Sequence, residues 1–167
     1  MEKKINIYSP ELDEKLIKSL KDFTYPDEFK DIKHIVDKLV DNTKYSDENL
    51  YIELYIGDAR EYIKDLDVKF DIVYQDAFSP STNPVLWTKE YFRDIKNLIS
   101  KTGVLTTYST ALKTRLALYE NGFNLYINKG QEFRNATLAS LSELDGYEKV
   151  DMEHKIKCNP DVEPLRD

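Results

Sequence analysis

Short apolar runs that predict β-strands alternate along this 167-residue chain with segments whose apolar residues recur at helical spacing. Strands are expected at 5–8, 50–56, 70–75, 104–108, 123–127 and 137–141. The last two strands are joined without a helix, which permits an antiparallel pair. The alternation therefore predicts an α/β fold with a mostly parallel sheet and one antiparallel strand near the C-terminus.

Length and composition are those of one ordinary globular domain. We expect this domain over residues 1–145, followed by a loosely ordered tail over 146–167. No apolar run approaches the ~20 residues that cross a bilayer, and the N-terminus lacks the apolar core of a signal peptide. A cytoplasmic location is therefore expected.

Several classes of site are disfavoured by the residues present. Cys158 is the only cysteine, so an internal disulfide or a cysteine metal cluster is impossible. His34 and His154 are the only histidines, so a histidine-based zinc site or a Ser-His-Asp triad has few candidate residues. No metal is expected. The five glycines are too far apart for a phosphate-binding glycine loop. The net charge of −7 argues mildly against broad non-specific binding of phosphates, although charge can be local.

The strongest candidate for an active site is Asp76, which follows a run of β-branched and aromatic residues that predicts a buried strand at 70–74. In open α/β sheets, ligands bind beyond the carboxyl ends of the strands. Pro80, Asn83 and Pro84 stiffen the segment behind Asp76. A fixed carboxylate there can orient an amine for group transfer. The alternative is an aspartate that only caps a turn.

Two further acidic positions follow predicted strands. Gly57-Asp58 ends the strand at 50–56, and Asp58 can accept a hydrogen bond from a nucleobase amino group, although Gly-Asp is also common in plain turns. Glu11 follows the strand at 5–8, which Ser9-Pro10 is expected to end. An acid in that position often binds ribose hydroxyls. The first turn of a helix over 11–20 is the simpler interpretation of Glu11.

Three further residues each allow a structural and a ligand-binding interpretation. Trp87 can stack on a planar ligand, but its place in the apolar stripe of the next helix favours the core. Ser109 can border a pocket, and capping of the following helix is the simpler interpretation. Arg134 can meet a phosphate or lie in solvent, and spacing does not decide between them.

The run Asp76-Ala77-Phe78-Ser79-Pro80, then Asn83-Pro84 and Trp87-Thr88, resembles the MnmC-type tRNA methyltransferases. The family pattern is D-[GA]-F-[SA]-P-x-x-N-P-x-[LM]-W-[ST], and this chain fits it throughout. The likeness covers about residues 5–141 and is strongest over 55–141. It implies a Rossmann-like class I methyltransferase fold that uses S-adenosylmethionine to methylate the aminomethyl group of the modified wobble uridine of tRNA.

The resemblance also implies roles for particular residues. Asp76 would hold the target amine and border the cofactor. Residues that would contact the cofactor are Gly57, Asp58, Ala59 and Glu11. Residues that would contact the substrate are Phe78, Ser79, Pro80, Asn83, Trp87, Ser109 and Arg134. The implied partners are tRNA and an FAD-dependent oxidase domain or protein.

One part of the family pattern has no counterpart in this chain. The first strand of the family and its glycine-rich loop, which holds the methionine end of the cofactor, would precede residue 1. We therefore expect a truncated member with weak or absent cofactor affinity, in which the edges of two strands pair together or stay unpaired. A non-catalytic remnant that binds tRNA or a partner protein is the alternative function.

Overall fold

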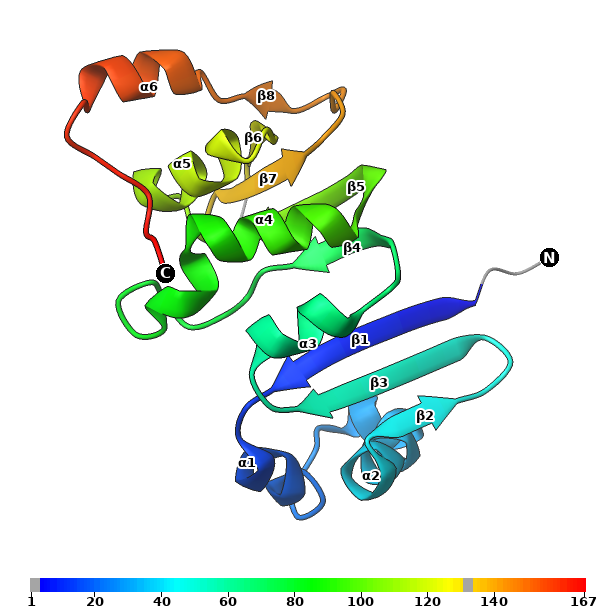
Figure 1. Cartoon of the computed structure of the whole chain (residues 1–167). Helices are drawn as coiled ribbons and strands as arrows, with labels where there is room; N and C mark the ends of the chain where they lie inside the picture. Colours follow the sequence, from blue (N-terminus) through cyan, green and yellow to red (C-terminus); the bar gives the residue numbers. More distant parts are fainter. Residues whose placement is uncertain (1–3, 131–133) are drawn as a thin grey trace. The chain divides into compact units, whose positions relative to one another are not determined.

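The structure is a computed structural model that describes residues 4–130 and 134–167. These residues form two compact units, Met1–Asp65 and Leu66–Asp167 (Figure 1). The expected domain boundary at residue 145 stays a prediction. The two units divide between Asp65, the last residue of a helix, and Leu66, which begins the short segment before the next strand.

Unit 1 is a three-stranded sheet with order β1-β3-β2. Its elements are β1 (Ile5–Glu11), α1 (Glu14–Ser19), η1 (Asp27–Ile32), α2 (Lys33–Asn42), β2 (Lys44–Ser46), β3 (Leu50–Ile56) and α3 (Ala59–Asp65). The long strands β1 and β3 are parallel, and the short β2 is antiparallel to β3. The polar segment 41–49 contains the end of α2 and all of β2.

The first strand is longer than the sequence predicts. Ser9-Pro10 does not end it, since β1 continues in register with β3 to Glu11. A proline is tolerated there because β1 is an edge strand of its sheet and one row of its N–H groups has no strand to bond. The first helix begins only at Glu14, after Asp13 caps it, so Glu11 is a strand residue rather than a first-turn helix residue.

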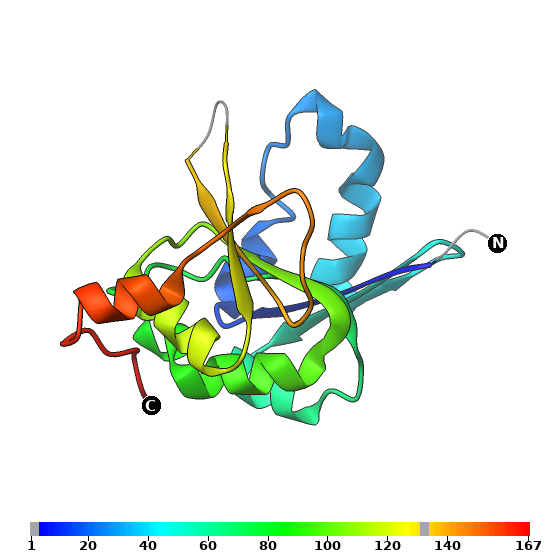
Figure 2. The same cartoon turned by 90° about the horizontal axis from the view of Figure 1, so that it is seen from above.

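Unit 2 is a five-stranded sheet with order β4-β5-β7-β6-β8. Its elements are β4 (Phe70–Tyr74), η2 (Pro84–Trp87), α4 (Lys89–Leu98), β5 (Ile99–Thr107), α5 (Leu112–Glu120), β6 (Asn124–Asn128), β7 (Ala136–Ser140), β8 (Glu148–Lys149) and α6 (Met152–Cys158). β4 and β5 are parallel, and β7 is the expected antiparallel strand between β5 and β6. The view in Figure 2 shows this sheet nearly edge-on.

The strand before Asp76 is more exposed than predicted. Ile72 is 54% and Tyr74 75% exposed, because β4 is the terminal strand of its sheet. In unit 1 the terminal strand β1 likewise exposes Ile5 and Ile7. β1 and β4 are thus each the terminal strand of a different sheet.

The core of unit 2 lies between the sheet and the helices α4 and α5. Its largest fully buried side chains are Trp87, Phe92, Leu105, Leu118, Phe123, Leu125 and Tyr126. α4 is capped by Thr88, whose Oγ1 accepts from Tyr91 N. Ala111 precedes α5 without a side-chain cap, so the predicted cap at Ser109 is wrong. Within the described residues, no helix is long and apolar enough to cross a membrane.

The C-terminal segment is ordered, contrary to the expectation of a loose tail. β8 pairs with β6, and Val150 N donates to Leu125 O at 2.8 Å. α6 follows, with Met152 buried. The last residues return to the start of α4, where Lys89 N donates to Leu165 O at 2.9 Å.

Candidate active site

Three side chains hold the loop between β4 and α4 by its backbone carbonyl oxygens. The bonds run from Gln75 Nε2 to Leu86 at 2.8 Å, from Tyr108 Oη to Ala77 at 2.8 Å, and from Trp87 Nε1 to Phe78 at 2.7 Å. The donors come from the end of β4, the end of β5 and the turn before α4. Because each bond fixes a backbone atom, the segment between β4 and α4 has a defined path, of which only η2 is helical.

Asp76 lies inside this anchored loop. Gln75 N still donates to Thr106 O at 2.9 Å, so Asp76 is the first residue beyond the pairing of β4 with β5. Its side chain is exposed, and no described residue donates to it or pairs with it. The structure thus presents a free carboxylate at the carboxyl edge of this sheet, between the anchored residues Gln75 and Ala77. Its role at a target amine stays a prediction.

Aromatic side chains of the same region differ in exposure. Phe78 is 77% exposed, and Tyr108 about half exposed. Trp87 is fully buried and meets Tyr108 edge to face at 5.8 Å and Phe92 at 6.4 Å. Contact of the Trp87 indole with a ligand is therefore not supported, and the core interpretation holds. Its function in this loop is to bond the Phe78 carbonyl.

The other predicted substrate residues of the loop stabilise its turn. Ser79 O accepts from Asn83 N at 2.9 Å and from Thr82 N at 2.8 Å. The Ser79 hydroxyl lies 2.8 Å from the hydroxyl of Ser81. Pro80 is half buried. These contacts make the segment a compact polar turn, and none of them tests whether the residues touch a substrate.

Ser109 is buried and its groups are already engaged. Its hydroxyl donates to Thr114 Oγ1 at 3.1 Å, and its carbonyl accepts from Thr137 Oγ1 at 2.7 Å. The same Thr137 oxygen accepts from Arg115 Nε at 3.1 Å.

Arg134 is exposed, just before β7. The sequence did not single out Arg115, because an arginine inside a helix is normally a surface residue.

In unit 1 the structure brings Glu11 and Gly57 together across 46 residues of sequence. Gly57 N donates to Glu11 O at 2.9 Å, which continues the parallel pairing of β1 and β3 to their common carboxyl edge. Gly57 has a φ of +153°, and a Cβ added to it would lie 2.7 Å from the Tyr55 ring. Glycine is therefore required at this turn.

Asp58 is half buried and caps the start of α3. Its Oδ2 pairs with Arg60 Nη2 at 2.7 Å, and its Oδ1 accepts from Arg60 N at 2.9 Å. The hydrogen bonds from Arg60 hold the pKa of the Asp58 carboxyl below its ordinary value, so it stays ionised at neutral pH. Ala59 begins the helix. This arrangement fits a turn, and Asp58 as a nucleobase contact stays a prediction.

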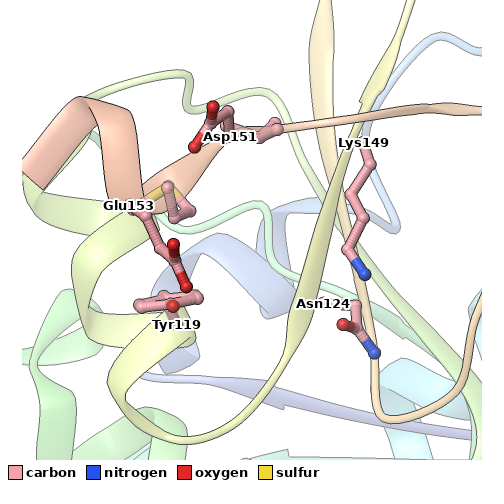
Figure 3. Close-up of a pocket in the computed structure, with 7 residues that line it drawn as sticks. Tyr119, Asn124, Lys149, Asp151 and Glu153 are labelled. Atoms are coloured by element: carbon pink, nitrogen blue, oxygen red, sulfur yellow. The ribbon is translucent and has the colours of Figure 1, made fainter.

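A separate pocket of about 400 Å³ lies elsewhere on unit 2 (Figure 3). Its wall is formed by Tyr119, Asn124, Lys149, Val150, Asp151, Met152 and Glu153. Asn124 begins β6, which runs in the same direction as β5, so this pocket is at the amino edge of the sheet. Asp76 follows the opposite edge, and the pocket contains none of the predicted site residues. Among the described residues, no group of three or more acidic, histidine or cysteine side chains is placed to hold a metal ion.

Comparison with known proteins identifies related sequences. Residues 27–142 match the model of a family of S-adenosyl-L-methionine-dependent methyltransferases. A stretch of 80 residues, 48% of the chain, is 40% identical to an uncharacterized protein of Methanocaldococcus jannaschii, of which it covers 22%. A stretch of 117 residues, 70% of the chain, is 31% identical to 19% of the tRNA 5-methylaminomethyl-2-thiouridine biosynthesis bifunctional protein MnmC of Campylobacter fetus. The chain thus spans about a fifth of the length of these curated relatives.

Solved structures agree with the sequence relatives. The crystal structure of MnmC2 from Aquifex aeolicus matches 98% of this chain and 52% of its own length, with a TM-score of 0.78 and 29% identity. A probable spermidine synthase from Corynebacterium glutamicum matches 98% of this chain and 72% of its own length, with a TM-score of 0.54 and 14% identity. The second likeness concerns the fold alone. The Rossmann-like methyltransferase fold expected from the sequence is confirmed.

Proposed function

This chain belongs to the family of S-adenosyl-L-methionine-dependent methyltransferases, and from that premise we propose that it methylates an amino nitrogen on the wobble uridine of tRNA. Relatives that match it are named for the biosynthesis of 5-methylaminomethyl-2-thiouridine in tRNA. The N-methyl group of that product requires an acceptor that carries a 5-aminomethyl group. The proposed substrate is therefore a primary amine held on a nucleobase.

The observation that carries the proposal is the Asp76 carboxylate, which is exposed, free of described partners and flanked by two anchored residues. A carboxylate accepts hydrogen bonds from an amine and so directs the nitrogen lone pair. In the transfer, the N–C bond forms as the S–C bond breaks, and the sulfur keeps the electron pair. The proton that the nitrogen then loses passes to Asp76 or to water. Positioning is the main contribution expected of the protein.

The residues of unit 1 fit the nucleoside part of the cofactor. Glu11 and the Gly57-Asp58 turn lie together at the carboxyl edge of β1 and β3, where Glu11 offers a carboxylate for hydroxyl donors and Asp58 one for an amino donor. Glu11 Oε1 accepts only from Asp13 N among the described residues. S-adenosylmethionine, when bound, supplies the methyl group. Asp58 would have to share its carboxylate with Arg60.

The exposed aromatic side chains of unit 2 suit a nucleobase substrate. Phe78 belongs to the loop that carries Asp76, and the Tyr108 hydroxyl donates to the backbone of that loop. Both rings reach solvent. Splayed bases of single-stranded RNA stack on such rings, and wobble bases lie in a single-stranded loop. An association with an FAD-dependent oxidase domain stays a prediction. The relative from Campylobacter fetus is called bifunctional, which is consistent with a second activity in that protein.

The proposal is tested by methyl transfer from labelled S-adenosylmethionine to tRNA that lacks the methyl group on its wobble uridine, with the full chain as enzyme. We expect transfer by the unaltered chain and a fall in kcat of about 100-fold or more for Asp76→Asn. The free energy of unfolding should change by less than about 0.5 kcal/mol, because the side chain is exposed and forms no hydrogen bond or ion pair with a described residue.

A matched control is Asp71→Asn, which removes the same charge from an exposed position on β4. Its turnover should equal that of the unaltered chain. Equal turnover of Asp76→Asn and Asp71→Asn would contradict the role of Asp76. Saturable tRNA binding without any methyl transfer, even at high cofactor concentration, would contradict the enzyme and favour a binding protein derived from the family.

A further inference from the structure

Arg115 is a buried cation without an anionic partner. It lies near the start of α5 and is only 6% exposed. Within the described part of the chain, its one side-chain hydrogen bond runs from Nε to Thr137 Oγ1 at 3.1 Å. Burial lowers the pKa of Arg115, and no neighbouring carboxylate offsets that effect. Buried charges in proteins are normally paired, because removing a charge from water is costly.

The hydrogen bond that Arg115 donates to Thr137 orients the guanidinium but does not neutralise it. Thr137 Oγ1 accepts from Arg115 and donates its own proton to Ser109 O at 2.7 Å. The Nε side of the guanidinium is thereby fixed. No described buried side-chain nitrogen or oxygen lacks a hydrogen-bond partner. The two Nη groups, which bond no described residue, therefore keep a small area in contact with solvent and have donors that no described residue uses.

The position of Arg115 relates it to the Asp76 edge of the same sheet. Its partner Thr137 is opposite Thr107, the last residue of β5, and Asp76 follows the end of the parallel neighbour β4. Two exposed cations lie near this pair in sequence, Lys113 two residues before Arg115 and Arg134 three residues before Thr137. Neither forms an ion pair with another described residue. This edge of unit 2 therefore carries a fixed guanidinium, and the chain places one unpaired cation close to Arg115 and another close to Thr137.

We propose that Arg115 binds a phosphate group of the RNA backbone. A guanidinium offers paired donors in a planar fork, which fits the oxygens of a phosphate. The exposed rings of Phe78 and Tyr108 near the ends of the neighbouring strands suit the bases of the same RNA. The assignment rests on the proposed function, since it takes tRNA as the substrate, and it adds a contact that fixes the backbone while Asp76 meets the base.

Removing the Arg115 charge should weaken tRNA binding without lowering the stability of the protein. Arg115→Met keeps the length of the apolar stem and removes an uncompensated buried charge, so the melting temperature should stay level or rise. Affinity for tRNA, measured without cofactor, should fall about tenfold, and the slope of log affinity against log salt should decrease in magnitude by about 1. The matched control is Lys101→Gln, which removes an exposed charge near the start of β5. It should change the tRNA affinity and the salt slope less than Arg115→Met does.

Arg115→Lys separates charge from geometry. It keeps the cation but loses the planar fork, so its affinity should lie between those of the unaltered chain and Arg115→Met. A lower melting temperature with unchanged tRNA affinity in both variants would overturn the proposal and make Arg115 a purely structural residue. Absence of tRNA binding by the unaltered chain would also overturn it. Binding through Arg115 without methyl transfer would contradict only the proposed function, whereas methyl transfer with Arg115-independent binding would contradict only this inference.

Discussion

The indole N–H of Trp87 donates a 2.7 Å hydrogen bond to the carbonyl oxygen of Phe78, nine residues earlier in the chain. The ring itself is fully buried, packed edge to face against Phe92 and Tyr108. One side chain therefore belongs to the core and at the same time fixes the backbone two residues beyond Asp76. The rigidity of the candidate active site is in this way derived from the core of unit 2.

Trp87→Phe should reduce both stability and turnover. The variant keeps an aromatic ring but leaves the Phe78 carbonyl without its donor, at an expected cost of about 1–3 kcal/mol in the free energy of unfolding. Turnover should fall because the loop around Asp76 becomes less ordered. The control is Phe92→Leu, which removes packing from the same core without touching the loop. Urea unfolding and methyl transfer should show both variants destabilised but only Trp87→Phe impaired in kcat. An equal loss of kcat in both would contradict this.

The stability of unit 1 should depend on pH through Glu53. Its carboxylate is bonded by Lys44 Nζ at 2.8 Å, Tyr51 Oη at 2.6 Å and Tyr62 Oη at 3.0 Å. These partners, Lys44 first, lower the pKa of Glu53 to about 2. Because the folded-state pKa lies below the unfolded one, the stabilisation is complete above about pH 5 and is lost as the pH falls toward 2. Its size is on the order of 2–3 kcal/mol.

Glu53→Gln isolates that contribution. Urea unfolding followed by circular dichroism at pH 7, 5 and 3 should show a large difference between Glu53→Gln and the unaltered chain at pH 7 and a smaller one at pH 3. The exposed Glu61→Gln serves as the control, since its side chain is 67% exposed and meets only Lys64. Parallel stability curves for Glu53→Gln and the unaltered chain would show that the Glu53 network does not act through its charge.

The sequence predicted the parts of the fold that depend on local pattern. The strands around residues 50–56, 70–74 and 136–140 are present because apolar and β-branched residues at strand spacing suit a sheet whatever surrounds them. The position of Asp76 beyond a strand was predicted for the same reason. The boundaries depended on tertiary contacts. Ile99 belongs to β5 rather than to the helix before it, because it pairs with Phe70.

The remaining differences come from contacts that pattern does not encode. The short strands β2 and β8 exist through pairing with β3 and β6, not through any apolar run of their own. Burial of Arg115 could not be predicted, because its polarity indicates a surface position and its only described side-chain partner, Thr137, is 22 residues away. The closeness of Glu11 and Gly57 likewise could not be predicted, because it depends on the register of β1 against β3.

The C-terminal residues should stabilise unit 2 through the cap of α4. Thr88 Oγ1 accepts from Tyr91 N at 3.1 Å and donates to Asp167 Oδ1 at 2.7 Å, so the carboxylate holds the hydroxyl in its capping orientation. Thr88→Ala should cost about 1 kcal/mol or more in the free energy of unfolding, and Asp167→Ala less. The double variant should cost less than the sum, by about 0.5–1 kcal/mol, because the two side chains act through one bond. A strictly additive double variant in urea unfolding would mean that the tail is ordered without supporting the helix.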